Sequence, residues 1–284
     1  MSSAVASKVL QHLRARVAGY RDRFMAAKPF GYVVMDDFLP TDIAEAILIA
    51  YPSPDKVWDG ATYVHQRKKF TLTKNLPHEC QDFFDLSASP EFLDMMSGIT
   101  GIPSLIPDRE LVGAGLHQIV DGGYLDVHVD FNLHPTTGLH RRCNLLVYLN
   151  KDWKREYEGH LELWDMSENR CIELVAPAFN RGVLFETNEI SYHGHPKPLH
   201  TPMGVSRKSL SVYYYTSDRD VSEIAPEHNT IYRYTDGFGS YVKAAGSAVT
   251  AFRERLARGH GTEILKDLGA RVWRALRRVP PPNG

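Results

Sequence analysis

The sequence has few cysteines and no long hydrophobic run. Its three cysteines, Cys80, Cys143 and Cys171, are widely spaced and form no Cys-x-x-Cys pair. A disulfide framework is therefore not expected, and reduced thiols are predicted. No stretch approaches the roughly 18 consecutive apolar residues that a membrane-spanning helix needs, so no transmembrane segment is predicted.

The chain also lacks an excess of either charge. Its 33 Lys and Arg residues are balanced by 34 Asp and Glu residues, which gives a formal net charge of −1. Overall charge thus indicates no polyanionic partner, and no nucleic-acid binding is predicted. Residues 1–23 contain no apolar stretch of the secretory-signal kind, so a cytoplasmic location is predicted. The 284 residues, 43% of them hydrophobic, are enough for a sizeable globular core.

Three regions of the chain differ in their hydrophobic pattern. Residues 1–109 mix helical spacing, including one amphipathic helix over 3–27, with short strand patterns, and residues 217–284 return to helical spacing with a basic face. Between them, residues 110–216 hold short β-type segments separated by turn signals. The expected strands are 111–120, 124–131, 142–150, 159–165, 170–175, 181–186, 191–195 and 207–216. This pattern predicts a mainly β fold with flanking helices (α+β), built on an antiparallel sandwich or barrel, in a single catalytic unit.

The most informative stretch covers residues 118–132. After a pair of glycines, polar and apolar residues alternate, so that Asp126, His128 and Asp130 share one face of a predicted strand. Carboxylates around an imidazole on a buried face need partners, and a divalent metal serves all of them at once. His128 therefore pairs with Asp130 or, by the same alternation, with Asp126.

A further histidine ligand is expected late in the β region. His193 lies in the segment 189–196, and His195 competes with it by the same two-residue spacing. A His-x-Asp pair on one strand followed by a distant histidine is the order of the facial triad of non-haem Fe(II) oxygenases. Such a triad leaves the remaining metal positions open for a co-substrate and O₂.

The strand 207–216 follows this histidine. Its alternation puts Arg207, Ser209, Ser211 and Tyr213 on one face. A guanidinium that faces the metal cavity can bind a carboxylate through two parallel hydrogen bonds, and Ser209 can add a hydroxyl donor beside it.

Taken together, these motifs resemble the prolyl 4-hydroxylase group of Fe(II)- and 2-oxoglutarate-dependent dioxygenases, with features of its HIF-type and ribosomal branches. The resemblance covers about 110–216 in a consistent order, and residues 28–39 resemble the opening of the ribosomal prolyl hydroxylases. The matching segments are 128–130, 142–153, 159–164, 177–185, His193 and 207–212.

The resemblance implies a double-stranded β-helix, the jelly-roll core also found in cupins. It implies Fe(II) held by His128, Asp130 and His193, which favours the last two over their rivals. It also implies that Arg207 binds the distal carboxylate of 2-oxoglutarate, with Tyr148 as its hydrogen-bonding neighbour. Asn144 shares the strand face of Tyr148 by alternation, and Gln118 opens the metal-site stretch, so both are weaker candidates for contact with the co-substrate.

The reaction predicted is hydroxylation of an unactivated C–H bond by O₂ and 2-oxoglutarate, with release of succinate and CO₂. L-Ascorbate (vitamin C) is expected to help to keep the iron reduced, as the family resemblance implies. The acceptor is left open between peptidyl proline, a free amino acid, a sugar and another small metabolite, and the oligomeric state is left open too. Two alternatives remain: a β-helix without catalysis that serves as a binding or scaffold module, and a cupin-type metalloenzyme that does not use 2-oxoglutarate.

Overall fold

The computed structural model describes residues 3–53, 59–63, 65–233 and 235. Residues 1–61 and 65–235 form one compact unit, and a second unit (62–64 and 236–284) lies almost wholly outside the described residues. The basic helix predicted near the C-terminus also lies outside them. The described part of 217–235 is not α-helical: it contains a 3₁₀ turn, Val221–Glu223, and the two-residue strand β12 (Ile231–Tyr232).

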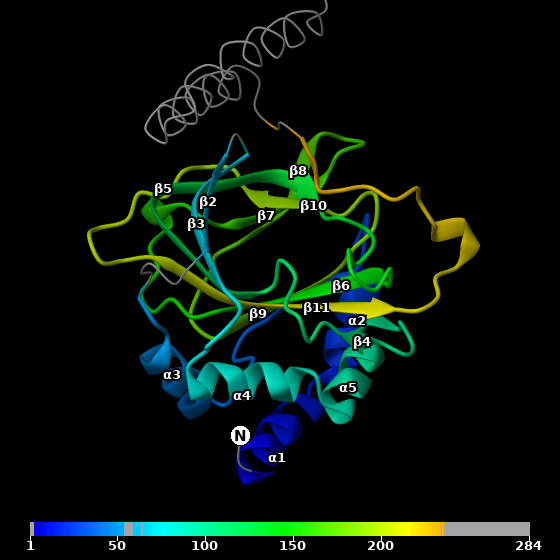
Figure 1. The fold of residues 1–284 in the computed structure, drawn as a ribbon, viewed down its shortest axis with the longest axis horizontal. Coiled ribbons are helices and arrows are strands. Elements are labelled where there is room, and N and C mark those ends of the chain that lie inside the picture. The colour runs from blue at the N-terminus through cyan, green and yellow to red at the C-terminus, as the bar shows by residue number, and fades with distance from the viewer. Residues whose placement is uncertain (1–2, 54–58, 64, 234, 236–284) are drawn as a thin grey trace, which may run out of the picture. The chain divides into compact units, whose positions relative to one another are not determined.

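An antiparallel sheet dominates the compact unit, with its main strands in the order β1-β9-β6-β11-β5-β10-β7-β8. The strands are β1 (Tyr32–Met35), β2 (Asp59–Tyr63), β3 (Gln66–Leu72), β4 (Ile106–Pro107), β5 (Gly115–Val129), β6 (His140–Tyr148), β7 (Leu161–Asp165), β8 (Arg170–Val175), β9 (Arg181–Glu186), β10 (Tyr192–His195) and β11 (Arg207–Thr216). Figure 1 shows the sheet folded into two layers, with β6, β9 and β11 below and β7, β8 and β10 above.

Strand β5 joins the two layers. Its first half pairs with β11, from Gly115 to Ile119, and its second half pairs with β10, where His128 lies opposite His193. Two separate strands were expected here, over 111–120 and 124–131, and that prediction is wrong. The chain bends at Gly122, whose φ of +73° suits glycine, without leaving the sheet, whereas 111–114 form a turn instead of a strand.

The two antiparallel layers, joined by β5, form the double-stranded β-helix that the family resemblance implies. The fold class, mainly β with helices outside, is confirmed. Alternate residues of each strand face the space between the layers, and the others face outward. The chemistry-bearing residues of the metal-site stretch therefore point into this space.

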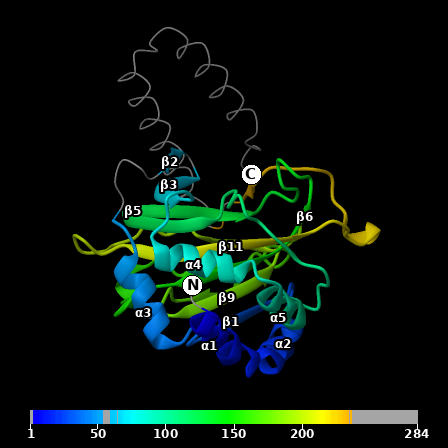
Figure 2. The ribbon, with the colours of Figure 1, turned by 60° about the horizontal axis from the view of Figure 1, so that its bottom comes forward.

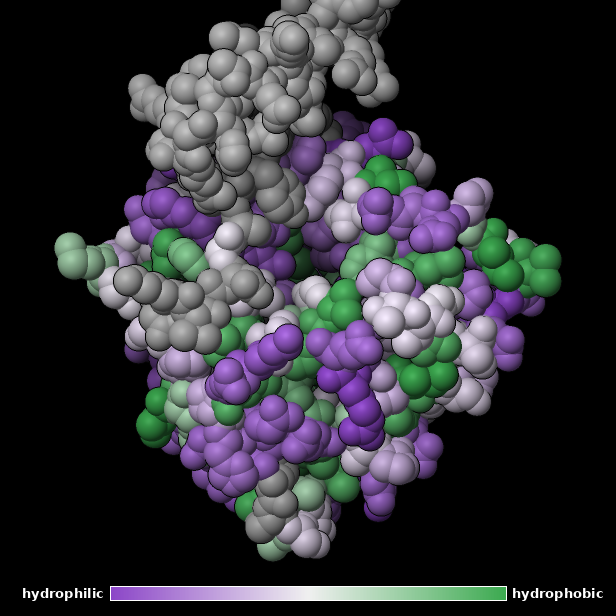
Figure 3. Space-filling model, viewed as in Figure 1, coloured by the Kyte–Doolittle hydropathy of each residue, from purple (hydrophilic) through white to green (hydrophobic). Residues whose placement is uncertain are grey.

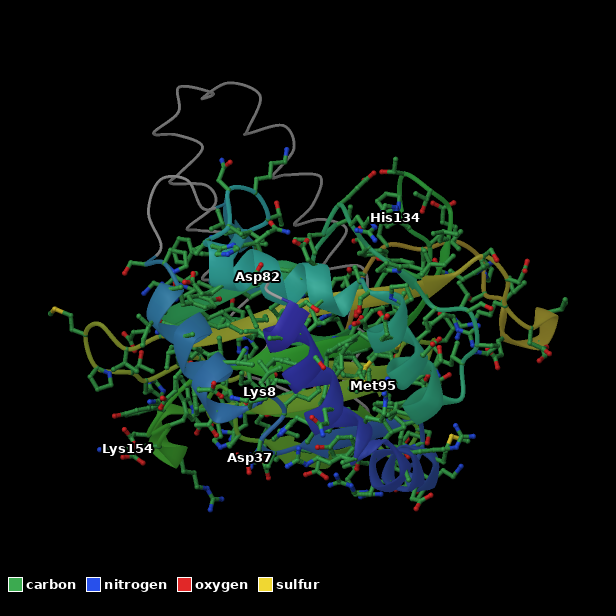
Figure 4. The ribbon with its side chains drawn as sticks, turned by 90° about the horizontal axis from the view of Figure 1, so that it is seen from below. Lys8, Asp37, Asp82, Met95, His134 and Lys154 are labelled. Atoms are coloured by element: carbon green, nitrogen blue, oxygen red, sulfur yellow. The ribbon has the colours of Figure 1, made fainter. Side chains whose placement is uncertain are left out.

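Five helices cover the outer side of the lower layer, as Figures 1 and 2 show. They are α1 (Ser3–Arg14), α2 (Val17–Ala26), α3 (Thr41–Ala50), α4 (His78–Ser87) and α5 (Pro90–Thr100). A single helix over 3–27 was expected, but the chain breaks after α1, where the Arg16 guanidinium binds the backbone oxygen of His12. Figure 4 views the helices from below, with α1 between α3 and α5, and Lys8 of α1 binds Asp42 of α3.

The helices pack on the apolar outward-facing residues of the lower layer. Leu145, Leu184 and Leu210 are fully buried there and share one cluster with Phe38 and Phe92. Helix α5 is preceded by its capping residue Ser89, whose hydroxyl accepts a hydrogen bond from the backbone of Phe92, and is followed by Gly101 in the left-handed conformation. This packing leaves the inner face of the sheet free for function.

The N-terminal region also supplies strands to the sheet. β1 pairs with β9, and β3 pairs with β5. The segment after β1 is attached to the turn before β9 by Asn180, whose side-chain amide donates to the backbone oxygen of Leu39 (2.7 Å) and accepts from its N–H (2.9 Å). Asn180 is 1% exposed and has a φ of +59°.

We expect Asn180→Ala to lower the free energy of unfolding by roughly 1–3 kcal/mol for each of the two Leu39 backbone groups that it leaves buried without a partner. Asn169→Ala is the matched control, because Asn169 also has a positive φ (48°) but is exposed. Its substitution removes only the tolerance of asparagine for that conformation, worth roughly 1–2 kcal/mol. Urea denaturation compares the two variants, and equal losses would contradict the role given to the Asn180 side chain.

All three cysteines are free thiols. Burial raises the pKa of Cys80 and that of Cys143 to about 12, so neither thiol ionises readily near neutral pH. In the part of the chain that the structure describes, every helix is too short or too polar to cross a membrane.

Candidate metal centre

Two histidines from the upper layer meet on the inner face of the sheet. His128 of β5 and His193 of β10 are register partners, and their ring centroids lie 4.4 Å apart. The Nδ1 atom of His128 is 2.8 Å from the backbone oxygen of Asp126, and Nδ1 of His193 is 3.0 Å from that of Ser191. An Nδ1–H bonded to a carbonyl leaves the Nε2 lone pair of each ring available as a ligand.

Asp130 completes the group at the end of β5. Its Oδ1 lies 3.6 Å from Nε2 of His128, and its Oδ2 lies 3.5 Å from Nε2 of His193. These separations are too long for strong hydrogen bonds but suit donors that surround one ion at metal–ligand distances of about 2.1 Å. Among the described residues, these three form the one group of His, Cys, Asp or Glu side chains whose donor atoms all lie within 4.8 Å of one another.

The rival ligands lie elsewhere. The Asp126 carboxylate is directed to the ring of His65, with Oδ2 3.2 Å from Nδ1. His195 pairs in register with Leu125, past an irregularity in β10, and is not part of the three-donor group. The structure thus brings His128, Asp130 and His193 together and leaves out both alternatives.

The electrostatics of the group favour metal binding. Burial alone would raise the pKa of Asp130, but Arg141, with smaller contributions from His193 and His128, holds that pKa well below its ordinary value. Burial, aided by His128, lowers the pKa of His193 to about 4, so its imidazole is neutral at physiological pH. An ionised carboxylate beside a neutral imidazole is the protonation state that a metal ion requires.

Arg141 forms an ion pair with the Asp130 carboxylate, and this role was not foreseen from the sequence. It is 1% exposed, donates from Nη2 to Oδ2 of Asp130 (3.0 Å), and lies between the rings of Tyr213 (3.6 Å from its centre) and Phe131 (4.5 Å). Asn144 joins the two: its amide nitrogen donates to Asp130 (2.7 Å) and its oxygen accepts from Arg141. Asn144 thus contacts the candidate metal ligand, not the expected co-substrate pocket near Arg207.

Arg207 lies at the other end of the inner face. Its Nη2 donates to the hydroxyl of Tyr148 (3.0 Å) and its Nε to the backbone oxygen of Gly159 (2.7 Å). Gly159 has a φ of +71°, and a Cβ there would lie 3.2 Å from Cδ of Arg207, so glycine allows the close approach. Burial raises the pKa of Tyr148 despite the nearby Arg207, so the phenol stays protonated and can donate a hydrogen bond.

The expected contribution of Gln118 is not found in this cavity. Gln118 pairs with Lys208, so it faces the helices, and its amide donates to Ser206 (2.6 Å). Its neighbour His117 pairs with Ser209 and faces inward instead. A one-residue offset in register reverses every side chain of a strand, and the sequence pattern did not resolve that offset.

His117 and Lys69 are two inward-facing residues that the sequence analysis missed. Nδ1 of His117 is 3.0 Å from the hydroxyl of Ser211, whereas its buried Nε2 has no hydrogen-bond partner among the described residues. Burial, followed by Lys69 and Arg207, keeps the pKa of His117 well below its ordinary value. Neither residue lies in a recognisable motif, and only strand pairing brings them to the site.

Comparisons with known proteins agree with this geometry. Residues 114–215 match the model of the 2OG-Fe(II) oxygenase superfamily. Prolyl 3-hydroxylase OGFOD1 of Mus musculus is 30% identical over 79 residues, which are 26% of this chain and 14% of that protein. The matched segment thus spans about one seventh of that relative.

Solved structures share the fold at low sequence identity. A Pseudomonas putida prolyl-4-hydroxylase is 15% identical with a TM-score of 0.51, and the alignment covers 70% of this chain and 98% of that one. A prolyl 4-hydroxylase from Phytophthora capsici is 17% identical with a TM-score of 0.55, covering 99% of this chain and 92% of that one. A Trichoplax adhaerens prolyl hydroxylase, solved with a hypoxia inducible factor peptide, is 17% identical with a TM-score of 0.50, covering 76% and 94%.

The family match, the shared fold and the grouped side chains agree over the same part of the chain. Residues 114–215 are therefore similar in sequence to the 2OG-Fe(II) oxygenase superfamily, and the fold of the described residues is shared with solved prolyl hydroxylases.

Proposed function

We propose that the protein is an Fe(II)- and 2-oxoglutarate-dependent hydroxylase. The overall change is R–H + 2-oxoglutarate + O₂ → R–OH + succinate + CO₂, in which one oxygen atom enters the acceptor and the other enters succinate. The observation that carries the proposal is the arrangement of three metal-ligating donors on the inner face of the sheet, which has a buried Arg–Tyr pair at its other end. The catalytic unit comprises a lead-in (1–109), the β-helix (110–216) and a C-terminal extension (217–284).

His128, Asp130 and His193 hold the metal in this proposal. The donor set of two neutral imidazoles and one carboxylate fits Fe(II) and leaves one side of the ion open. Bound Fe(II) with its 2-oxo acid supplies the activation of O₂, chemistry that side chains alone do not provide. The protein's part is orientation: backbone oxygens of Asp126 and Ser191 fix the two rings, and the pair of Arg141 and Asn144 fixes the carboxylate.

Arg207 and Tyr148 bind the distal carboxylate of 2-oxoglutarate in this proposal. The guanidinium is anchored through Nε on Gly159, so its orientation is set before the ligand arrives. Tyr148 accepts from Arg207 and retains its own proton for the ligand. Ser209 is on the same strand face as Arg207 and can add a hydroxyl donor. L-Ascorbate serves as the reductant that keeps the iron in its ferrous state.

The test is product formation by the purified protein. Metal-free protein is reconstituted with Fe(II) under anaerobic conditions, given 2-oxoglutarate and air, and analysed for succinate. We expect succinate that depends on protein, Fe(II) and O₂ together. A protein that binds Fe(II) but forms no succinate would support the cupin-type alternative, and one that binds neither ligand would support a scaffold role.

Candidate acceptors then identify the oxidised substrate. The relatives are prolyl hydroxylases by name. A prolyl peptide is therefore the first acceptor to try, and free amino acids and sugars follow. A true acceptor raises succinate formation and gains one oxygen atom by mass spectrometry.

A further inference from the structure

Lys69 is a cation inside the proposed catalytic cavity that the reaction described above does not use. It is located on β3 in register with Ile119, which in turn pairs with Arg207 on β11. Residues paired across an antiparallel sheet share a face, so Lys69 projects from the same face as Arg207. The face of the molecule drawn in Figure 3 is hollowed near its centre.

The charged groups that shift the pKa of Lys69 belong to the proposed catalytic site. Burial lowers its pKa to about 8, Asp130 opposes that shift, and Arg207 and Arg141 add to it. At neutral pH the ammonium therefore remains largely charged within a cluster of cations. Among the described residues, the ammonium group of Lys69 forms no hydrogen bond or ion pair, although its backbone pairs with β5.

Asp130 cannot neutralise this cluster by itself. It already pairs with Arg141, and in the proposed function its charge also holds the metal. The carboxylate of Asp126, also on β5, is directed to His65. The distal carboxylate of 2-oxoglutarate is matched to Arg207. Among the residues that the structure describes, Lys69 is then left without an anion, and Nη1 of Arg141 is buried without an acceptor.

Lys69 is half-buried on the inner face, so an anion that enters from solvent can pair with its ammonium. We propose that the acceptor carries an oxyanion, a carboxylate or phosphate, which Lys69 recognises while the reacting C–H bond faces the metal. Lys69 is thus a specificity residue for an acidic acceptor. This inference rests on the proposed function and deepens it by giving the chemical class of the acceptor.

The first test is a binding footprint that needs no turnover. Protein loaded with Zn(II) and 2-oxoglutarate, which does not react with O₂, is acetylated with a small amine reagent, and modification of Lys69 is followed by mass spectrometry. Three matched pairs of probes are used: N-acetylproline and its amide, a blocked Pro-Glu peptide and its Pro-Gln counterpart, and glucose 6-phosphate and glucose. Lys197, whose side chain is 64% exposed, reports the general reactivity of the reagent.

We expect the acidic member of at least one pair to protect Lys69 with an affinity roughly 10- to 150-fold above that of its neutral member, as for loss of one charged hydrogen bond. The probe pair that shows this difference in protection identifies the acceptor as a small acid, an acidic peptide or a phosphate ester. Lys197 should be unaffected. Equal protection by both members of every pair, no protection by any probe, or full protection by 2-oxoglutarate alone would each overturn the proposal.

A variant then ties the preference to this side chain. Lys69→Met should remove the preference for the acidic probe in succinate formation and leave the 2-oxoglutarate dissociation constant unchanged. Lys68→Met is the matched control, because Lys68 is adjacent on the chain and directs its ammonium to the backbone oxygen of Asp121. If the wild-type protein forms no succinate at all, the proposed function fails; if it forms succinate and Lys69→Met keeps the preference, only this inference fails.

Discussion

Arg207→Ala is expected to weaken 2-oxoglutarate binding by about 2–5 kcal/mol, or roughly 30- to several-thousand-fold, with little change in Fe(II) affinity. The guanidinium is buried, and its fork is aimed by Gly159 and Tyr148. Removing it would leave the far carboxylate of the ligand desolvated without a counter-charge. The dissociation constant is measured by titrating 2-oxoglutarate into anaerobic Fe(II)-loaded protein and following the metal-to-ligand charge-transfer band.

Two further variants divide this effect into parts. Arg207→Lys should recover only a fraction of the affinity, because a point charge does not reproduce the two parallel hydrogen bonds of a guanidinium. Tyr148→Phe should cost about 1 kcal/mol, as for a single hydrogen bond. An unchanged dissociation constant in Arg207→Ala would move the co-substrate anchor elsewhere and strengthen the alternative without 2-oxoglutarate.

His193→Ala is expected to abolish Fe(II) binding and succinate formation together, and His128→Ala and Asp130→Ala should do the same. Each removes one of three donors that are grouped within 4.8 Å. The loss of Fe(II) affinity should exceed the roughly 10- to 100-fold loss that is typical when a residue hydrogen-bonded to a metal ligand is removed. Asn144→Ala provides that comparison, because Asn144 touches the metal site only through Asp130. Metal content after anaerobic loading and desalting measures both effects.

His195→Ala is the control for this series, since His195 is a buried histidine two residues from His193 and outside the three-donor group. It should keep most of the iron and most of the activity. Thermal denaturation without metal shows whether each variant folds. Asp130→Ala has an added cost of roughly 3–5 kcal/mol in stability, because Arg141 would then be a buried charge without its partner. An active His193→Ala and a dead His195→Ala would reverse the assignment of the third ligand.

Local period predicted an antiparallel sandwich or barrel and the candidate donors, and the family resemblance implied the double-stranded β-helix and the choice of Asp130 and His193. The alternation around His128 determines which residues share a face with it, and a strand period of two carries that information without any tertiary contact. The later positions of His193 and Arg207 supplied the rest of the pattern. Along the chain, strands β6 to β11 follow the segments that the turn signals separate, whereas in β5 the bend at Gly122 keeps two predicted strands in one.

Register and long-range pairing decided the remainder. An alternating strand tells which residues lie together but not which of its two faces is turned inward, so Gln118 was chosen where His117 faces the cavity. Arg141 contacts Asp130 because the turn after β5 brings the start of β6 back toward the metal site. Lys69 faces the same space from β3, which lies far earlier in the sequence. The sequence by itself determined the ligand types and their order. The tertiary structure decided which charges surround them, because electrostatic neighbours depend on distances that sequence spacing does not contain.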